Sequence, residues 1–324
     1  MQTEALQTPV ALFIFKRPHT TALVFNAISK VRPAKLLLIA DGPRQDREGE
    51  AEACRQVLDI VARVDWPCEV FKNFSQRNLG CGERMISGLN WVFSLVEEAI
   101  VLEDDCLPDL SFFTFCQELL ERYRGDHRIA YISGDNLAGK HKKLANSYYY
   151  SQIAMIWGWA TWRPEWLRYD RHLSDWPEIK KQRILEEIFD EPRTVRYWTR
   201  VFEAMHAGSG PDTWDFQWLY TALINNSLAI VPAVNLVTNL GFGDGATHTL
   251  QEDRSGMIPA SSMEFPLRHP PSFNPLRSLD RRRMQGMVPR PIPLRILNKF
   301  MEVAGRVSRR LSTATLRSEE DPVS

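Results

Sequence analysis

Three consecutive acids, Glu103, Asp104 and Asp105, directly follow the apolar run at residues 99–102. Carboxylates repel one another and lose favourable hydration when buried, so acids crowded at a strand end indicate either open solvent or a shared hard cation. The cation would be Mn²⁺ or Mg²⁺, held by one or two carboxylates, water and the oxygens of a substrate diphosphate. The alternative is a solvated acidic turn before a helix, where acids favour the positive end of the helix dipole. The preceding apolar run and the late position in an alternating α/β pattern favour the metal site.

Two earlier apolar runs also end on polar residues that suit a nucleotide. Arg17 follows the run at residues 10–15, and Asp41 follows the run at residues 36–40. An arginine and an aspartate at successive strand ends are able to read the edge and ribose of a nucleotide, since aspartate accepts from N–H and O–H groups. Each is equally compatible with an ordinary turn. The glycine motifs of dinucleotide-binding and P-loop proteins do not follow these runs.

Apolar runs of strand length alternate with helical segments, which predicts an α/β domain with a largely parallel sheet. Such a sheet binds ligands at the carboxyl ends of its strands, where Arg17, Asp41 and the three acids are expected. The predicted strands are residues 10–15, 36–40, 69–72, 99–102, 129–133 and 235–240. The predicted helices are residues 20–31, 47–63, 83–97, 111–123, 177–188, 194–207 and 214–225, the first capped by Thr20 or Thr21.

The composition is that of a globular protein without a dedicated nucleic-acid function. The 324 residues are 44% apolar and include ten tryptophans, enough for a large core without disulfides or metals. Forty basic residues balance forty acidic ones, so we expect no nucleic-acid partner. Five cysteines without a Cys-x-x-Cys pair indicate reduced thiols in a cytoplasmic protein. We expect no secretion signal, and no apolar run approaches the roughly 20 residues needed to cross a bilayer.

The C-terminal part of the chain is proline-rich and basic. Residues 277–317 contain eleven Arg or Lys and two acids, and so carry a net charge of +9. One amphipathic helix is predicted at residues 294–311, with a disordered end from residue 312. A basic helix of this kind is able to lie on anionic lipid at the inner face of a membrane, to pack on its own domain or to contact a partner. We therefore predict one domain at residues 1–255 and an extension at residues 256–324.

Taken in order, these motifs resemble the glycosyltransferases of the GT-A type. The similarity is to the β-1,2-N-acetylglucosaminyltransferase I group and to bacterial sugar-nucleotide transferases labelled hemolytic-protein-like, and it covers residues 9–253. It implies a mostly parallel mixed central sheet flanked by helices. It also implies a metal-dependent enzyme that transfers a hexose or N-acetylhexosamine, with inversion, from a UDP-sugar. The implied acceptor is a hydroxyl of a glycan or lipid-linked molecule in surface polysaccharide or glycan synthesis.

In this resemblance the acids and their neighbours take separate roles. Asp105, the last acid of the triplet, corresponds to the metal ligand, and Asp104 corresponds to a ribose or diphosphate contact. Glu103 is grouped with the donor-binding residues, with a purely structural role as its alternative. Arg17 and Asp41 correspond to contacts with uridine.

Further motifs border the predicted donor pocket. The strand and turn that contain Asp135 correspond to a segment near the donor sugar. A glycine-tryptophan motif corresponds to one that shapes the sugar and acceptor pocket. We assign Trp159 alone to the pocket, and Trp162 and Trp166 to packing, because aromatic faces stack on sugars whereas most tryptophans are core residues. Arg84 is predicted either to meet a phosphate or to lie on the solvent face of a helix start.

The resemblance also implies a catalytic base and a loop over the diphosphate. Asp215 lies in a Trp-Asp segment that opens a helix and is the predicted base. Asp212 is its competitor, and capping of the helix is the alternative role for Asp215. The glycine-rich stretch that begins at Gly241 resembles a loop that orders over the diphosphate and excludes water. We therefore predict that Thr247 and His248 contact the donor.

Two rival functions stay open. A sugar nucleotidyltransferase shares the α/β scheme and the acidic metal site. It would carry a glycine-rich loop after its first strand, whereas residues 13–20 contain no glycine. A non-catalytic sugar-binding or membrane-active protein would keep the fold without turnover. The ordered set of metal site, base and loop weighs against this second rival.

Overall fold

The computed structural model describes residues 5–137, 144–153, 155–241 and 258–289. One compact unit comprises Met1–Gln285, and a second comprises Gly286–Ser324. Thr247, His248 and the helix predicted at residues 294–311 lie outside the described residues. None of the helices within the described ranges has the length and apolar character to span a bilayer. All five cysteines are free thiols, as predicted.

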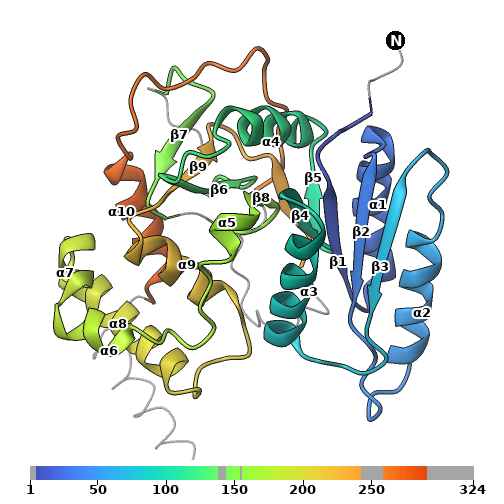
Figure 1. The fold of residues 1–324 in the computed structure, drawn as a ribbon, viewed down its shortest axis with the longest axis horizontal. Helices are drawn as coiled ribbons and strands as arrows, with labels where there is room; N and C mark the ends of the chain where they lie inside the picture. The colour runs from blue at the N-terminus through green and yellow to red at the C-terminus, as the bar shows by residue number, and fades with distance from the viewer. Residues whose placement is uncertain (1–4, 138–143, 154, 242–257, 290–324) are drawn as a thin grey trace, which may run out of the picture. The chain divides into compact units, whose positions relative to one another are not determined.

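Within the described residues, an eight-stranded mixed sheet forms the centre of the first unit, in the order β3-β2-β1-β4-β8-β6-β9-β7 (Figure 1). Strands β1 to β4 are mutually parallel. Strand β6 runs in the same direction as β4, because β8 pairs antiparallel with both of them. Strand β9 pairs parallel with β6, whereas β7 runs antiparallel to β9. The mostly parallel mixed sheet is therefore confirmed. Its strands are β1 (Val10–Ile14), β2 (Lys35–Ala40), β3 (Glu69–Phe74), β4 (Glu98–Glu103), β6 (Ile129–Ser133), β7 (Tyr148–Ser151), β8 (Trp159–Trp162) and β9 (Leu228–Pro232).

A small second sheet lies directly after the acidic triplet. It pairs β5 (Cys106–Pro108) antiparallel with β10 (Val237–Asn239). Beyond this pair, the Leu240 N–H donates to the carbonyl oxygen of Asp105 at 2.7 Å. The late predicted strand at residues 235–240 therefore exists in shortened form, and it approaches the acids from a distant part of the sequence.

Helices flank the sheet as predicted, but the helices at residues 163–166 and 277–287 were not predicted, and two others differ in detail. The helix expected at residues 177–188 is two short helices, because Arg183 adopts a left-handed backbone with φ of 60° between them. The first helix starts at Pro18 instead of after a threonine cap, and proline suits this position because it lacks the N–H that would stay unpaired there. The helices are α1 (Pro18–Val31), α2 (Glu50–Val61), α3 (Cys81–Leu95), α4 (Ser111–Arg122), α5 (Arg163–Trp166), α6 (Trp176–Lys181), α7 (Ile184–Ile188), α8 (Pro192–His206), α9 (Asp215–Ile224) and α10 (Arg277–Met287).

The two faces of the sheet bury different sets of side chains. Successive strand residues point to opposite faces, so Leu12 and Leu38 pack in one core cluster with residues of α1, α2 and α4. Phe13 and Ile39 lie in a second cluster with residues of α3 and with Trp159. Helix α3 therefore covers the opposite face from α1 and α2 (Figure 1). Burial on both faces explains why these strands read as continuous apolar runs.

The register of the parallel strands brings the predicted site residues to one edge. Phe13 of β1 pairs with Ile39 of β2 on one side and with Glu103 of β4 on the other. The residues that follow each strand therefore leave the sheet at the same level. Arg17, Asp41 and the acids after β4 belong to these following segments, which is the arrangement that the alternating pattern predicts.

The first compact unit continues past the predicted boundary at residue 255. Ser261 donates its N–H to the Asn235 carbonyl at 2.7 Å, and the Met263 N–H reaches the Ser111 hydroxyl at 2.8 Å. Further along, the Tyr148 hydroxyl lies 3.0 Å from Nδ1 of His269. Residues 258–285 are therefore part of this unit, whereas the sequence pattern assigns them to the extension.

Glu50, the first residue of α2, joins the segments that follow β1 and β2. Its buried carboxylate accepts from Lys16 Nζ at 2.7 Å and from Arg44 Nη2 at 2.5 Å. The Arg44 backbone N–H donates to the same group at 2.8 Å. Hydrogen bonds from Arg44, followed by those from Lys16, lower the pKa of Glu50 from 4.5 to about 2. Glu50 thus fixes two positive side chains beside the edge that carries the site.

We expect E50Q to lower the free energy of unfolding at pH 7 by about 2 kcal/mol, because two partly exposed cations lose their buried, charged partner. The native pKa lies below the unfolded one, so the wild-type advantage is complete above pH 4.5 and declines as the pH falls toward 2. Urea unfolding at pH 7 and pH 4 checks both points. E52Q, at an exposed position of the same helix, is the matched control. An equal loss for both variants, or a loss independent of pH, would contradict this role.

Candidate active site

A cleft of about 490 Å³ lies at the carboxyl ends of β1, β2 and β4. A cavity of this size is in the range that holds drug-sized ligands and cofactors. The starts of α3 and α9 and the segments at residues 156–157 and 239–241 form the rest of its wall. It is lined by Phe13, Ile14, Phe15, Arg17, Asp41, Arg44, Asn78, Gly80, Cys81, Arg84, Met85, Glu103, Asp104, Asp105, Ile156, Trp157, Asp212, Thr213, Trp214, Asp215, Asn239 and Gly241.

The acidic centre, defined as Glu103, Asp104 and Asp105, forms one side of this cleft. Arg17 Nη1 lies 2.7 Å from Asp105 Oδ2 and 3.1 Å from Asp104 Oδ1. The backbone N–H of Phe15 donates to the other oxygen of Asp104 at 3.0 Å. Helix α1 begins directly after Arg17, so the arginine is held at the strand edge by the backbone. A single guanidinium thus bridges two of the three carboxylates.

The acidic centre is short of positive charge despite Arg17. Burial, followed by the negative charges of Asp105, Asp104 and Asp215, raises the pKa of Glu103 to about 8 against the smaller opposing effect of Arg17. Burial and the neighbouring Asp105 also raise the pKa of Asp104 to about 6. Raised pKa values at adjacent carboxylates are the signature of like charges that share a partly desolvated site. An added cation would relieve this repulsion.

The donor set fits a hard cation that arrives together with a substrate. Within the described residues, no group of three or more His, Cys, Asp or Glu side chains is arranged to hold a metal ion. Mg²⁺ and Mn²⁺ sites that bind nucleotides use one or two carboxylates, and phosphate and water oxygens supply the rest. Asp105 has the more exposed side chain, at 13% against 6% for Asp104, so it would be the direct ligand and Asp104 its neighbour.

Asp41 lines the cleft, but its carboxylate accepts hydrogen bonds from the neighbouring loop. Its Oδ1 accepts the N–H groups of Gly42 and Leu79, both at 2.9 Å. Its Oδ2 accepts the side-chain amide of Asn78 at 2.9 Å and is 3.2 Å from the Leu79 N–H. Burial raises the pKa of Asp41, and the backbone N–H groups of Leu79 and Gly42 oppose that rise. Asp41 therefore holds this loop in place at the end of β2.

The two acids proposed as catalytic base differ in their contacts. Asp212 accepts the N–H groups of Cys81 at 2.9 Å and Gly82 at 3.0 Å, one with each oxygen, at the start of α3. Gly80 makes this approach feasible, because it has φ of 85° and a Cβ there would lie 2.5 Å from the carboxylate. Asp215, the first residue of α9, bonds locally to the Thr213 hydroxyl and the Phe216 N–H. Both acids line the cleft, but only Asp212 uses its carboxylate to bind the backbone of another helix, α3.

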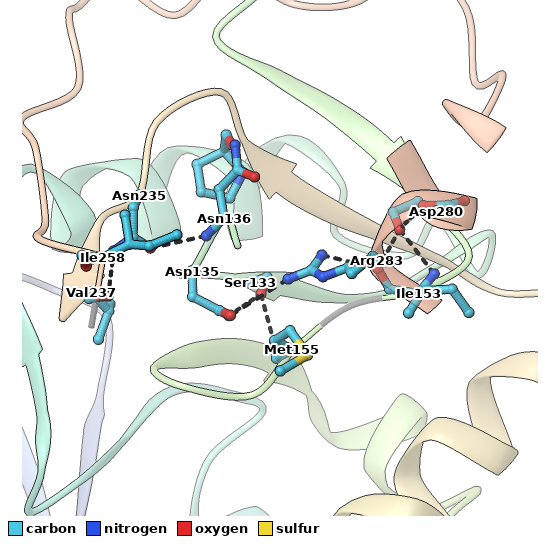
Figure 2. Close-up of polar contacts among 12 residues, drawn as sticks. Ser133, Asp135, Asn136, Ile153, Met155, Asn235, Val237, Ile258, Asp280 and Arg283 are labelled. Atoms are coloured by element: carbon cyan, nitrogen blue, oxygen red, sulfur yellow. Dashed lines mark hydrogen bonds and ion pairs between the residues drawn. The ribbon is translucent and has the colours of Figure 1, made fainter. Parts of the chain in front are cut away.

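Two predicted donor contacts do not lie in the cleft. Trp159 is fully buried and stacks on Trp214, with ring centres 5.5 Å apart, so its assignment to the pocket is corrected to core packing. The lining tryptophan is Trp157. Asp135 is also fully buried; it accepts from Ser133 at 2.8 Å and pairs with Arg283 at 3.5 Å (Figure 2). Asp135 thus binds α10 and not the cleft.

Some lining residues escaped the sequence patterns. Arg44 and Trp157 line the cleft but were not assigned to it. The signal for Arg44 was its place three residues after Asp41, at the end of a predicted strand. Trp157 precedes β8, and all four residues of β8 are buried, so no alternation in the sequence sets Trp159 apart as a core residue. Trp162 and Trp166 are buried, as predicted.

Comparisons with known proteins leave the family open. No model of a known protein family matches the chain, and no curated protein matches its sequence. Among solved structures, the chain is similar to a UDP-glucose pyrophosphorylase in complex with UDP-glucose. The identity is 11% and the TM-score 0.27, over 50% of this chain and 70% of the other. Similarity at this level identifies no activity, so function has to follow from the residues of the cleft.

We expect D212A to lower the free energy of unfolding by about 1 kcal/mol, because it removes the acceptor for two N–H groups at the start of α3. D212N keeps an acceptor oxygen and should lose less. D215A removes only local contacts and serves as the matched control. Urea unfolding of the three variants measures the differences. A loss for D215A as large as that for D212A would contradict the assignment of Asp212 to α3.

We expect R17M to bind Mn²⁺ several-fold more tightly than the wild type when no nucleotide is present. The change removes the guanidinium that neutralises Asp104 and Asp105, and both carboxylates then become available to a cation. R17K keeps the positive charge and should behave as the wild type. Titration calorimetry or the paramagnetic resonance signal of free Mn²⁺ gives the affinities. Equal affinities for wild type and R17M would show that the cation does not bind at these carboxylates.

Proposed function

We propose that this protein is a glycosyltransferase that uses a nucleotide-diphosphate sugar and a divalent cation. One observation carries the proposal. A single cleft of about 490 Å³ brings together the acidic centre, Arg17 and a second carboxylate, Asp215, at the carboxyl ends of parallel strands. The acidic centre suits a cation with a diphosphate, and Asp215 suits a base for an acceptor hydroxyl.

The proposed reaction is a single displacement. An acceptor hydroxyl attacks the anomeric carbon of the donor sugar, and the bond from that carbon to the diphosphate oxygen breaks. Asp215 takes the hydroxyl proton, and the electron pair of the broken bond stays on the nucleoside diphosphate. Attack on the face opposite the leaving group inverts the anomeric centre. A bound divalent cation would neutralise charge on the leaving diphosphate.

Arg17 and the surroundings of Asp215 support this division of roles. Arg17 presents a guanidinium beside Asp105, where a diphosphate bound through a cation would meet a second positive group. Asp215 is the better base of the two candidates, because Asp212 gives both of its oxygens to backbone N–H groups of α3. The charge of Asp215 also contributes to the raised pKa of Glu103, so the base and the acidic centre act on one another across the cleft.

The proposed acceptor is a hydroxyl of a glycan or lipid-linked molecule. This part of the proposal rests on the resemblance of the ordered motifs and on the net charge of +9 over residues 277–317. A basic segment of this kind would favour contact with anionic lipid. UDP is proposed as the nucleotide on the same resemblance.

The proposal is tested by binding and turnover with a panel of UDP-, dTDP-, GDP- and CMP-sugars, with and without Mn²⁺. We expect a diphosphate sugar to bind more tightly with Mn²⁺ and to be consumed when a glycan acceptor is added. Absence of binding by every nucleotide sugar would overturn the proposal. Release of pyrophosphate from UTP and a sugar 1-phosphate, without sugar transfer, would replace it with a sugar nucleotidyltransferase.

We expect D105N and D215N to separate the two halves of the mechanism. D105N should abolish the strengthening of UDP binding by Mn²⁺, because it removes the charged ligand. D215N should leave UDP affinity within about twofold and lower turnover at least about 100-fold, as expected for loss of a general base. D190N, at an exposed acid that pairs with Arg281 outside the cleft, is the control. Full turnover in D215N would reassign the base to Asp212.

A further inference from the structure

Two side chains of the cleft wall belong to the connection between β7 and β8, at residues 152–158. They are Ile156 and Trp157. The described residues of this connection form no helix or strand, so no ladder of backbone hydrogen bonds sets their position. The place of Trp157 in the wall therefore depends on the side chains that hold the connection from outside.

The connection is held by side chains from two elements that lie far apart in the sequence. Arg283 of α10 donates from Nη1 to the Ile153 carbonyl at 3.1 Å (Figure 2). Ser133, the last residue of β6, has its hydroxyl 2.6 Å from the Met155 carbonyl. Both carbonyls shortly precede Trp157 in the chain. These two contacts thus fix the backbone that leads into the cleft wall.

Each of two buried serine hydroxyls in this network lies between two acceptors, a backbone carbonyl and a carboxylate. The contacts are those of Ser133 with the Met155 carbonyl and Asp135 Oδ1, and those of Ser151 with the Ile153 carbonyl and Asp280 Oδ1. A hydroxyl donates one proton, whereas carbonyls and ionised carboxylates only accept. Each serine therefore leaves one of its two acceptors without a proton.

Arg283 supplies the missing donors. Its Nη1 meets the Ile153 carbonyl and its Nη2 lies 3.5 Å from Asp135 Oδ2, so the guanidinium reaches one acceptor of each serine (Figure 2). With Asp135 served in this way, the Ser133 proton is available to the Met155 carbonyl. The side chain of Arg283 is only 3% exposed and that of Asp135 is fully buried, so bulk water does not take over these contacts.

A purely stabilising role for the ion pair is the alternative. A buried pair such as Asp135 with Arg283 is frequently no more stable than apolar residues of similar volume, because both charges lose their hydration. Arg283 Nε is also buried without a hydrogen-bond partner among the described residues, which costs further stability. An arginine differs from an apolar residue, and from lysine, in the planar fork that holds two acceptors at fixed positions. What Arg283 adds is therefore geometry.

From this geometry we infer that Arg283 is a positioning residue for the cleft: oriented by Asp135, it fixes the Ile153 carbonyl and thereby places Trp157 in the cleft wall. The inference rests on the proposed function where it assigns this wall to a nucleotide-sugar ligand. It makes α10, which follows every strand of the sheet in the chain, part of what shapes the site. Arg281, on the exposed face of the same helix, pairs with Asp190 instead.

The position of Trp157 is tested without a ligand by ¹⁹F NMR of the full chain labelled with 5-fluorotryptophan, with W157F to assign its resonance. The variant D135N/R283M removes both charges of the buried pair, so no ionised Asp135 is left without a partner. We expect the Trp157 resonance to shift or broaden in this variant, and that of Trp66, in the core beside α1 and α2, to stay unchanged. R281M is the matched control. An unchanged Trp157 resonance in D135N/R283M would overturn the inference.

The effect on the site is tested by calorimetry with UDP-glucose and UDP-N-acetylglucosamine as probes, each with Mn²⁺. We expect D135N/R283M and W157A each to weaken binding of the better probe at least about fivefold, and W157A/D135N/R283M to bind no more than about twofold more weakly than W157A, because both changes act through one side chain. Additive penalties would overturn the inference. If no nucleotide sugar binds the wild type, the proposed function falls, and the Trp157 resonance alone decides the inference.

R283K separates geometry from charge. Lysine keeps the positive charge beside Asp135 but lacks the planar fork that reaches the Ile153 carbonyl at the same time. We therefore expect R283K to shift the Trp157 resonance and to weaken probe binding at least about threefold at pH 8. Asp135 is ionised at that pH, because burial, opposed by the charge of Arg283, raises its pKa only to about 6. Wild-type spectra and affinity in R283K would show that charge alone suffices, which would overturn the inference.

Discussion

The repulsion among carboxylates at the end of β4 is the constraint on which the site depends. Glu103, Asp104 and Asp105 lie together because the strand ends there, and burial makes their charges costly. Arg17 supplies the neutralising positive charge, because β1 pairs with β4 and the two strands end at the same edge of the sheet. The opening of α1 directly after Arg17 keeps this counter-charge in place. A cation and a diphosphate would extend the same compensation to the ligand.

Acids at the edge of this cleft serve two distinct purposes. Asp41 and Asp212 take backbone N–H groups from the segment at residues 79–82, one from the side of β2 and the other from the start of α9. This segment is thereby held between two carboxylates before any ligand binds. Asp105 and Asp215, the proposed metal ligand and base, accept no N–H group from that segment. Of the acids that line the cleft, Asp41 and Asp212 therefore have structural roles and would be miscounted as catalytic candidates by their position alone.

The sequence reveals the parts of the site that follow from strand ends. Arg17, Asp41 and the acids were expected together because parallel strands deliver their carboxyl ends to one edge, and this expectation is confirmed. Asp135 was misplaced because its partner Arg283 lies far along the chain, in a segment assigned to the extension. Trp159 was misplaced because a strand covered on both faces has no alternation that distinguishes inward from outward residues. The position of Asn78 beside Asp41 depends on two hydrogen bonds that no local pattern encodes.

The strand order also sets a sequence of events during synthesis. Strands β2, β3 and β4 each find a partner among strands already made, so the floor of the cleft can assemble early. β7 has to wait for β9, which lies between it and β6 in the sheet but follows it in the chain. The hydrogen bonds that Asp212 accepts from the start of α3 also form late, because Asp212 lies far after α3 in the chain. A ribosome-bound chain would therefore present the acidic centre before the wall that carries Asp215, and domains of this length commonly fold through such partly formed states.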